Sequence, residues 1–299
     1  MNRERGRLGG YWKRTPALPL SLFISMAACK SASTAPPPPP PPVADAATSI
    51  APDVPRVDAA IDDAASAVID AAPEAEAPRA IGPFELPFAE KRNVFFVVPP
   101  RRGKARLIAN LHGMCNPPGY ACGYWVNAGS SHGFLVCPTG NASCGPAMYN
   151  APTWTESTTK MDEDLERAIA VVDGAYPGEV SRDGAILTGF SKGAYVAPDI
   201  AKMHPGRWPY LILNEANVAL DAASLRKSGV RAVAMIAGEK GNEVNGERAT
   251  VAALEKKGFP AKLWVMPGAG HYYSANIDDI MREAIDWLIA HGADDAGSP

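Results

Sequence analysis

A serine lies where an apolar run meets an amphipathic stretch, in the segment Gly189-Phe190-Ser191-Lys192-Gly193. The apolar residues Ala185–Phe190 predict a strand, and the spacing in Lys192–Met203 predicts a helix. A tight turn from strand to helix would hold the serine hydroxyl above the end of the sheet, with glycines where the backbone segments come close together. The N-terminus of the following helix favours negative charge that develops there. The pattern therefore predicts that Ser191 is a nucleophile.

A histidine that could serve as the base of this serine follows the last predicted strand. Strand Lys262–Val265 leads into the glycine-rich loop Met266–Gly270, and His271 comes next. A nucleophilic serine that precedes its histidine along the chain agrees with the order found in hydrolases that carry this elbow. The other histidines lie before the elbow, in a predicted loop, past a helix end or near the C-terminus, and fit the role less well: His112, His132, His204 and His291.

Attack of a serine on a carbonyl group also requires two backbone N–H groups that stabilise the oxyanion. The residue after the nucleophile, Lys192, is expected to provide one of them. The loop after predicted strand Arg106–Leu111 reads His112-Gly113-Met114, and we expect the N–H group of Met114 to provide the other. Gly113 would give this turn its conformational freedom.

With these motifs, the region from about Asn93 to Ala290 resembles the α/β-hydrolase superfamily, and in particular its esterases and lipases. The resemblance implies an α/β fold of the α/β-hydrolase type, with a mostly parallel central sheet and helices on both faces. It also implies a serine hydrolase that works through a covalent acyl-enzyme and needs no cofactor or metal. Ester hydrolysis is the commonest activity of this superfamily.

The acidic member of the triad is where the sequence departs from that superfamily. The superfamily usually places an aspartate three residues past a glycine after the strand that corresponds to Ala232–Ala237, but this chain has Gly241 there. Three glutamates could replace it: Glu215 after the preceding strand, then Glu243, then Glu239. We rank Glu215 first, because a carboxylate that directly follows an apolar strand is costly to desolvate without a partner.

Short apolar runs alternate with amphipathic stretches along the domain, which predicts βαβ units and a mostly parallel sheet. The predicted strands are Asn93–Val98, Arg106–Leu111, Phe134–Cys137, Ala185–Phe190, Tyr210–Leu213, Ala232–Ala237 and Lys262–Val265. The predicted helices are Met161–Ala175, Lys192–Met203, Ala222–Lys227, Gly246–Lys257 and Ile277–Ala290. Four aromatic residues near the strand ends, Tyr124, Trp125, Trp154 and Tyr272, are candidates either for an apolar pocket or for ordinary packing.

Four cysteines in this region fall into two close pairs and favour an exported protein. Several connectivities are open, and the simplest joins Cys115 to Cys122 and Cys137 to Cys144. A bridge between Cys115 and Cys122 would hold the loop that carries Met114. A zinc site is the competing interpretation, but the spacing matches no familiar zinc finger.

The N-terminal part of the chain predicts export and a tether. Residues 1–29 combine several arginines and lysines with a short apolar stretch, and they end in Met26-Ala27-Ala28-Cys29, which resembles a bacterial lipobox. We expect acylation of Cys29, with simple cleavage of a signal peptide and an uncleaved anchor as alternatives. Residues 30–80 are rich in Pro and Ala and predict a disordered tether, and residues 81–299 are expected to form the hydrolase domain.

The composition of the chain limits the kinds of partner that the protein is expected to bind. A formal net charge of −3 and a pI near 6.0 argue against a nucleic-acid partner. We expect a small-molecule ester substrate, an extracytoplasmic location that is either lipid-anchored to a bacterial membrane or secreted, and membrane contact through a lipid anchor only. Two other interpretations remain: a serine peptidase of the prolyl-oligopeptidase type, and a surface binding protein that has kept the fold but lost catalysis.

Overall fold

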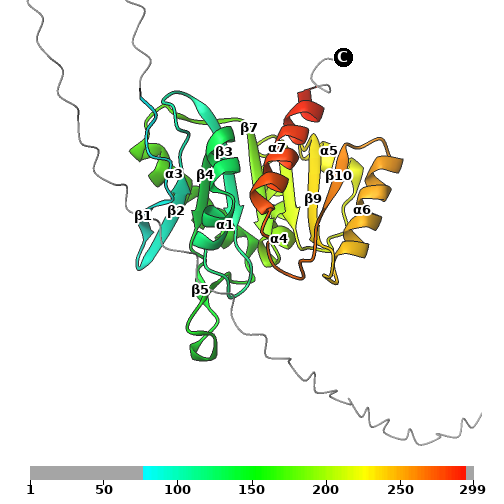
Figure 1. The fold of residues 1–299 in the computed structure, drawn as a ribbon, viewed down its shortest axis with the longest axis horizontal. Coiled ribbons are helices and arrows are strands. Elements are labelled where there is room, and N and C mark those ends of the chain that lie inside the picture. Colours follow the sequence, from blue (N-terminus) through cyan, green and yellow to red (C-terminus); the bar gives the residue numbers. More distant parts are fainter. Residues whose placement is uncertain (1–76, 294–299) are drawn as a thin grey trace, which may run out of the picture. The chain divides into compact units, whose positions relative to one another are not determined.

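A computed structural model of the chain describes residues 77–293, which build a mixed sheet of eight strands with helices on both faces (Figure 1). The strands follow the order β1-β2-β4-β3-β7-β8-β9-β10. β1 pairs antiparallel with β2, and β2 pairs antiparallel with β4, whereas all the other neighbours are parallel. The strands of this sheet are β1 (Phe84–Ala89), β2 (Arg92–Val97), β3 (Ala105–Leu111), β4 (Gly133–Pro138), β7 (Val180–Phe190), β8 (Tyr210–Asn214), β9 (Ala232–Gly238) and β10 (Ala261–Met266).

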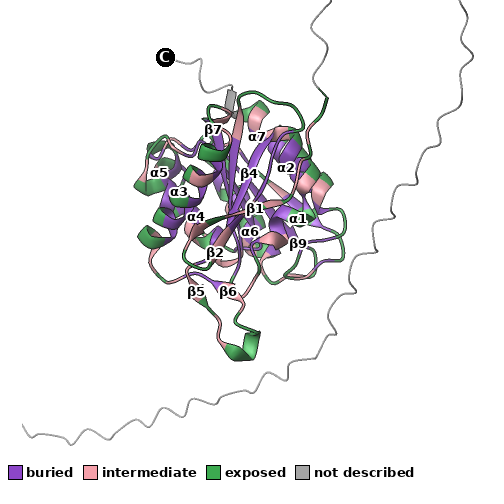
Figure 2. Cartoon of the chain, turned by 90° about the vertical axis from the view of Figure 1, so that its left-hand side faces the viewer, coloured by how far each residue is buried: buried purple, intermediate pink, exposed green. Residues whose placement is uncertain are grey.

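Helices cover both faces of this sheet. They are α1 (Gly119–Tyr124), α2 (Val126–His132), α3 (Thr158–Ala175), α4 (Lys192–Met203), α5 (Ala222–Lys227), α6 (Val244–Lys256) and α7 (Ile277–Ala293). The side chains of α3, α4, α5 and α6 pack into one core, and those of α1, α2 and α7 pack into the other. Figure 2 shows the buried strands enclosed between the helices. The predicted fold class is confirmed.

The two cores explain why the sequence shows continuous apolar runs. In β3, Leu107, Ala109 and Leu111 face the first core, whereas Ile108 faces the second. A strand that is buried on both faces has no polar side, so its sequence is apolar throughout rather than alternating. These runs are the feature from which the parallel strands were predicted.

All seven predicted strands and all five predicted helices are present, with ends that differ by at most a few residues except at β7. β7 begins at Val180, upstream of the predicted apolar core, and its pairing with β3 is irregular there. Strand β1, an edge strand whose register shifts between Pro87 and Ala89, was not predicted from the sequence. Nor were α1 and α2, which are short, or the small sheet of β5 (Ala142–Ser143) and β6 (Pro152–Thr153) that flanks the short helix η1 (Pro146–Met148).

The predicted disulfide pairing was wrong. Cys115 is bonded to Cys144, with 5.7 Å between their Cα atoms, and Cys122 is bonded to Cys137, with 6.4 Å between theirs. Cys115 lies in the loop after β3, and Cys144 directly follows β5, in the segment that continues from β4, the neighbour of β3 in the sheet. Cys122 lies on α1, which packs over β4, where Cys137 is located. Spatial proximity, rather than separation along the chain, therefore selects both pairs.

The disulfides fit an oxidising compartment, since such bonds rarely persist in a reducing cytosol. None of the helices within residues 77–293 has the length and apolar character needed to cross a membrane. The predicted signal segment, the lipobox with Cys29 and nearly all of the tether lie outside the described residues.

Candidate active site

The loops that follow β7, β8 and β10 bring Ser191, Glu215 and His271 together at the carboxyl ends of these strands. His271 Nε2 lies 2.9 Å from Ser191 Oγ. On the other side of the imidazole ring, Nδ1 lies 3.3 Å from Glu215 Oε2. A hydroxyl, an imidazole and a carboxylate in this series can transfer a proton from the hydroxyl to the ring and stabilise the charge that the ring acquires.

Ser191 lies at the sharp turn between β7 and α4. Its φ of 49° and ψ of −116° are unusual for a residue with a side chain. The turn is stabilised by the N–H group of Ser191, which donates to Asn214 O at 2.8 Å. A Cβ atom at Gly189 would overlap the backbone of Gly193 and Ala194, and one at Gly193 would overlap Leu111 O. Both glycines of the motif are therefore required by close backbone contact.

His271 is half exposed, so a substrate can reach its Nε2 side. Interaction with the Glu215 carboxylate raises the pKa of His271, while partial burial of the ring opposes this rise. The Phe190 ring packs against the imidazole with 5.3 Å between the ring centroids. The ring is thus held between an aromatic neighbour and a carboxylate.

Glu215 is fully buried and has a φ of 55°. Its N–H group donates to Ile236 O at 2.9 Å, and its Oε1 accepts a hydrogen bond from the N–H group of Gly238. A Cβ atom at Gly241 would lie 3.1 Å from Glu215 Oε2. The position where α/β-hydrolases usually carry an aspartate is therefore next to the Glu215 carboxylate, and the glycine there leaves space for it.

The other two candidate glutamates bind elsewhere. Glu243 Oε2 accepts hydrogen bonds from Tyr195 Oη at 3.3 Å and from the N–H group of Asn217 at 3.2 Å. Glu239 is exposed, and its Oε2 accepts from the N–H group of Gly268 at 2.8 Å. Of the three glutamates, Glu215 is the one that the tertiary structure places against His271.

The two predicted oxyanion donors lie on backbone segments beside the serine. A Cβ atom at Gly113 would lie 3.3 Å from Ser191 Cβ, so the loop that leads to Met114 passes directly by the hydroxyl. Lys192 is the first residue of α4, and the first N–H groups of a helix have no acceptor within it. The Met114 side chain is exposed, so a role for this residue would rest on its backbone.

A buried network supports the loop that carries Met114. His112 Nε2 accepts from the N–H group of Gly140 at 2.9 Å, so Nδ1 carries the proton and donates to Gly113 O at 2.7 Å. Burial lowers the pKa of His112 to about 4, which keeps the ring neutral. Trp154 Nε1 donates to His112 O at 2.9 Å, and the two rings stack.

The same network extends to the other predicted donor. Lys192 Nζ donates to Trp154 O at 2.8 Å and pairs with Glu156 at 2.5 Å. Of the two roles open to Trp154 from the sequence, pocket lining or ordinary packing, its burial in the core agrees with packing. No sequence signal linked it to His112 or Lys192, because their contacts join segments far apart in the chain.

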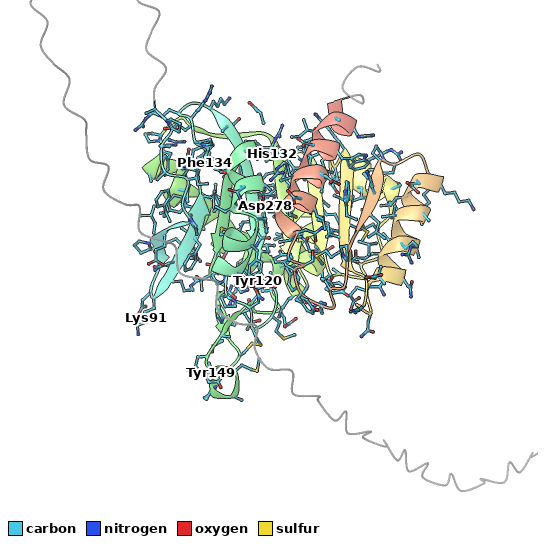
Figure 3. The ribbon with its side chains drawn as sticks, in the orientation of Figure 1. Lys91, Tyr120, His132, Phe134, Tyr149 and Asp278 are labelled. Atoms are coloured by element: carbon cyan, nitrogen blue, oxygen red, sulfur yellow. A yellow bond between two sulfur atoms is a disulfide. The ribbon has the colours of Figure 1, made fainter. Side chains whose placement is uncertain are left out.

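Aromatic residues adjoin the histidine. Tyr273 is buried, stacks on Tyr120 with 5.0 Å between centroids, and contacts Phe190 at 4.9 Å. Tyr120 lies toward the lower edge of the domain in Figure 3, and Tyr149 marks the loop between β5 and β6 that extends below it. Of the remaining pocket candidates, Tyr124 and Tyr272 are exposed, whereas Trp125 is buried in the core.

Among residues 77–293, no three His, Cys, Asp or Glu side chains converge closely enough to hold a metal ion. The four cysteines of this region, for which zinc was an alternative, are paired in disulfides.

Comparisons with known proteins support the fold assignment. No family model matches the sequence, and no curated protein matches it. Among solved structures, S-formylglutathione hydrolase of Staphylococcus aureus superimposes with a TM-score of 0.50 at 12% identity, over 72% of this chain and 99% of that protein. Fluorophosphonate-binding serine hydrolase F of the same organism gives a TM-score of 0.50 at 14% identity, over 66% of this chain and 92% of that one.

A ferulic acid esterase also matches, with a TM-score of 0.50 at 17% identity, over 69% of this chain and 96% of that enzyme. These structural neighbours are esterases and serine hydrolases with an α/β-hydrolase fold, and the chain shares this fold. At such low sequence identity the likeness concerns the fold alone.

Proposed function

We propose that the protein is a serine hydrolase that cleaves carboxylic esters through a covalent acyl-enzyme. The observation that carries this proposal is the contact series at the strand ends, in which Ser191 Oγ lies 2.9 Å from His271 Nε2 and His271 Nδ1 lies 3.3 Å from the buried Glu215 carboxylate. Separations of this size are compatible with a triad before substrate binds, since catalytic hydrogen bonds often shorten in the complex.

In the proposed reaction, Ser191 Oγ attacks the ester carbonyl while His271 Nε2 takes the hydroxyl proton. The carbonyl oxygen becomes an oxyanion, which the N–H groups of Met114 and Lys192 stabilise. When the tetrahedral intermediate collapses, the proton on His271 passes to the departing alkoxide and the acyl group stays on Ser191. A water molecule, activated by His271 in the same way, then releases the acid.

Glu215 acts on this reaction through His271. A carboxylate near Nδ1 selects the tautomer with a free Nε2 and stabilises the imidazolium that forms during attack. The missing aspartate at Gly241 was the feature that favoured a binding protein without catalysis. The buried Glu215 next to Gly241 supports catalysis instead, because it offers a carboxylate in the place of that aspartate.

The ester class of the substrate is supported by a structural neighbour that is described as a ferulic acid esterase. We propose a small-molecule ester as the substrate and an extracytoplasmic location, in keeping with the two disulfides.

A substitution of the nucleophile tests the proposed function. Ser191→Ala removes the attacking oxygen and is expected to abolish covalent labelling by a fluorophosphonate and to lower turnover of a short-chain aryl ester by up to about a millionfold. The wild type and a catalytically neutral surface variant, Lys91→Ala, serve as controls. A Ser191→Ala protein that keeps most of the wild-type activity would show that the proposed mechanism is wrong.

A further inference from the structure

A second buried glutamate, Glu247, lies behind the candidate active site. It belongs to the first turn of α6, and its side chain is fully buried. Glu247 Oε1 accepts a hydrogen bond from the N–H group of Ala216 at 2.7 Å. Ala216 directly follows Glu215 in the chain and is itself buried, so Glu247 satisfies a backbone donor that would otherwise be unpaired.

This contact is made by the neighbour of a residue whose own backbone is constrained. Glu215 has a φ of 55°, which places its backbone in the left-handed region. Its N–H group donates to Ile236 O, and the next N–H group along the chain donates to Glu247. Hydrogen bonds from the N–H groups of Glu215 and Ala216 therefore hold the backbone of this turn, while the N–H group of Gly238 holds the carboxylate itself at Oε1.

Helix α6 lies close against the turn that contains these residues. A Cβ atom at Gly246 would overlap the side chain of Asn217. One helical turn further on, Thr250 Oγ1 donates to Val218 O at 3.0 Å. The helix thus supports residues 216–218, and Glu247 is its contact nearest to Glu215.

Glu247 also differs from Glu215 in charge. Burial raises the pKa of Glu247 to about 9, and the nearby charges of Glu215 and Glu243 contribute to this rise. At neutral pH the group is therefore a carboxylic acid, whose carbonyl oxygen can accept the Ala216 hydrogen bond without placing a second negative charge beside Glu215. An amide would do the same.

We propose that Glu247 is a positioning residue, whose carboxyl group fixes the turn after β8 so that Glu215 faces His271. This inference rests on the proposed function, since it concerns the same triad. Helix α6 then has a role in positioning the triad that the sequence motifs around Ser191 and His271 do not reveal.

Three substitutions at this position test the proposal. Glu247→Gln keeps an acceptor oxygen at the same distance and is expected to retain kcat within about threefold. Glu247→Met removes the acceptor, and Glu247→Asp withdraws it by one methylene group. Both are expected to lower kcat on the order of a hundredfold with little change in KM, since a displacement of about 1 Å can have this effect.

The pH profile supplies a readout that a loss of stability alone would not move. Interaction with Glu215 raises the pKa of His271, with a further contribution from the charge of Glu243. If Glu215 turns away, the pKa of His271 falls, and the acid limb of kcat/KM shifts to lower pH. We expect this shift in the Met and Asp variants and its absence in the Gln variant.

Thr250→Val is the matched control, because it removes a hydrogen bond from α6 to the same turn without touching Glu215 or Ala216. It should lower the melting temperature but leave kcat and the acid limb unchanged. If the Glu247→Met protein does not fold, the kcat and the acid limb of the Glu247→Asp variant test the proposal.

Two results would overturn the proposal. One is a wild-type kcat and an unshifted acid limb in both the Asp variant and a folded Met variant. The other is a loss of kcat in the Gln variant as large as that in the Asp variant. Failure of the proposed function is distinguishable, because the wild type would then not react with the fluorophosphonate.

Discussion

Two residues of the proposed triad have backbone conformations that side chains usually avoid. Ser191 has a φ of 49° and Glu215 a φ of 55°, and each directly follows a strand. Conformations of this kind cost roughly 1–3 kcal/mol each and persist when the surroundings impose them. Here the imposing contacts are hydrogen bonds to the neighbouring strand ends, to Asn214 O from Ser191 and to Ile236 O from Glu215. The side chains of both residues contact His271.

The role proposed for Glu215 can be tested by an amide substitution. Glu215→Gln removes the negative charge that would stabilise imidazolium and is expected to lower kcat on the order of ten-thousandfold. KM and the melting temperature should change little. Steady-state kinetics on a short-chain aryl ester, with thermal melts, measure both.

Glu243→Gln and Glu239→Gln are the controls, because these carboxylates bind elsewhere. Both should retain near-normal turnover. A large loss confined to Glu243→Gln would assign the acid to the loop after β9, the usual strand of the superfamily, and normal turnover in all three variants would leave His271 without a carboxylate partner.

The raised pKa of His271 predicts the direction of the pH dependence. The base must be neutral to accept a proton, so activity should increase as pH rises through the pKa of His271. Because the Glu215 carboxylate stabilises the protonated ring, the midpoint should lie above the ordinary value of 6.5. The rate of fluorophosphonate labelling as a function of pH measures it in the wild type. In Glu215→Gln the midpoint should move to lower pH, and an unchanged midpoint would contradict the assigned contact.

At the scale of the elements, the bridge between Cys115 and Cys144 joins the loop after β3 to the segment between β5 and β6. The loop after β3 carries Met114, and the segment between β5 and β6 contains the short helix η1. The bridge between Cys122 and Cys137 instead fastens α1 to β4 inside the second core. One bridge therefore borders the candidate site, while the other stabilises packing.

The two disulfides are expected to differ in their effects. Removing the Cys122–Cys137 bridge by a double serine substitution should reduce the free energy of unfolding by about 3 kcal/mol, as the chain-entropy model predicts for a loop of its length. Removing the Cys115–Cys144 bridge should in addition lower kcat, because a donor of the oxyanion site becomes mobile.

Denaturant unfolding and steady-state kinetics on both variants measure these effects, after the pairing has been verified by non-reducing peptide mapping. Peptides that join Cys115 to Cys122 would refute the observed pairing. If kcat is unchanged when the Cys115–Cys144 bridge is removed, this bridge has no role in catalysis.

At the scale of the whole molecule, the sheet separates two apolar cores, and the candidate site lies at one edge of both. His271 and Phe190 belong to the side where α7 packs, whereas Ser191 directly precedes α4, which packs on the opposite side. Residues from both layers thus meet where the strands end, as is usual for sites in open α/β sheets.

The predicted lipid anchor concerns the part of the chain that precedes this domain. If Cys29 is acylated, Cys29→Ser should move the protein from the membrane fraction to the soluble fraction after expression in a bacterium. Immunoblots of the two fractions, with the Ser191→Ala protein as a control for expression, measure this. Unchanged partitioning of the serine variant would favour a simple signal peptide or an uncleaved one.

The sequence by itself determined the features that depend on local pattern. Apolar runs and helical spacing identified seven strands and five helices, because burial on both faces of a sheet leaves a continuous signal. The elbow around Ser191 and the loop before His271 were visible for a different reason. Glycines that close backbone contacts require occur there at fixed spacing. The edge strand β1 was missed because Pro87 and a register shift interrupt its pattern.

Only the tertiary structure decided which distant groups meet. It placed Glu215, rather than Glu243 or Glu239, against His271, because the turn after β8 and the glycine at position 241 leave a buried space between two strand ends. It paired each cysteine with one on a neighbouring element instead of with the nearest cysteine along the chain. It also assembled the network behind Met114 and the contact from Glu247 to the turn after Glu215. Such contacts join residues many positions apart, and a single sequence carries no pattern for them because the packing of helices on the sheet creates them.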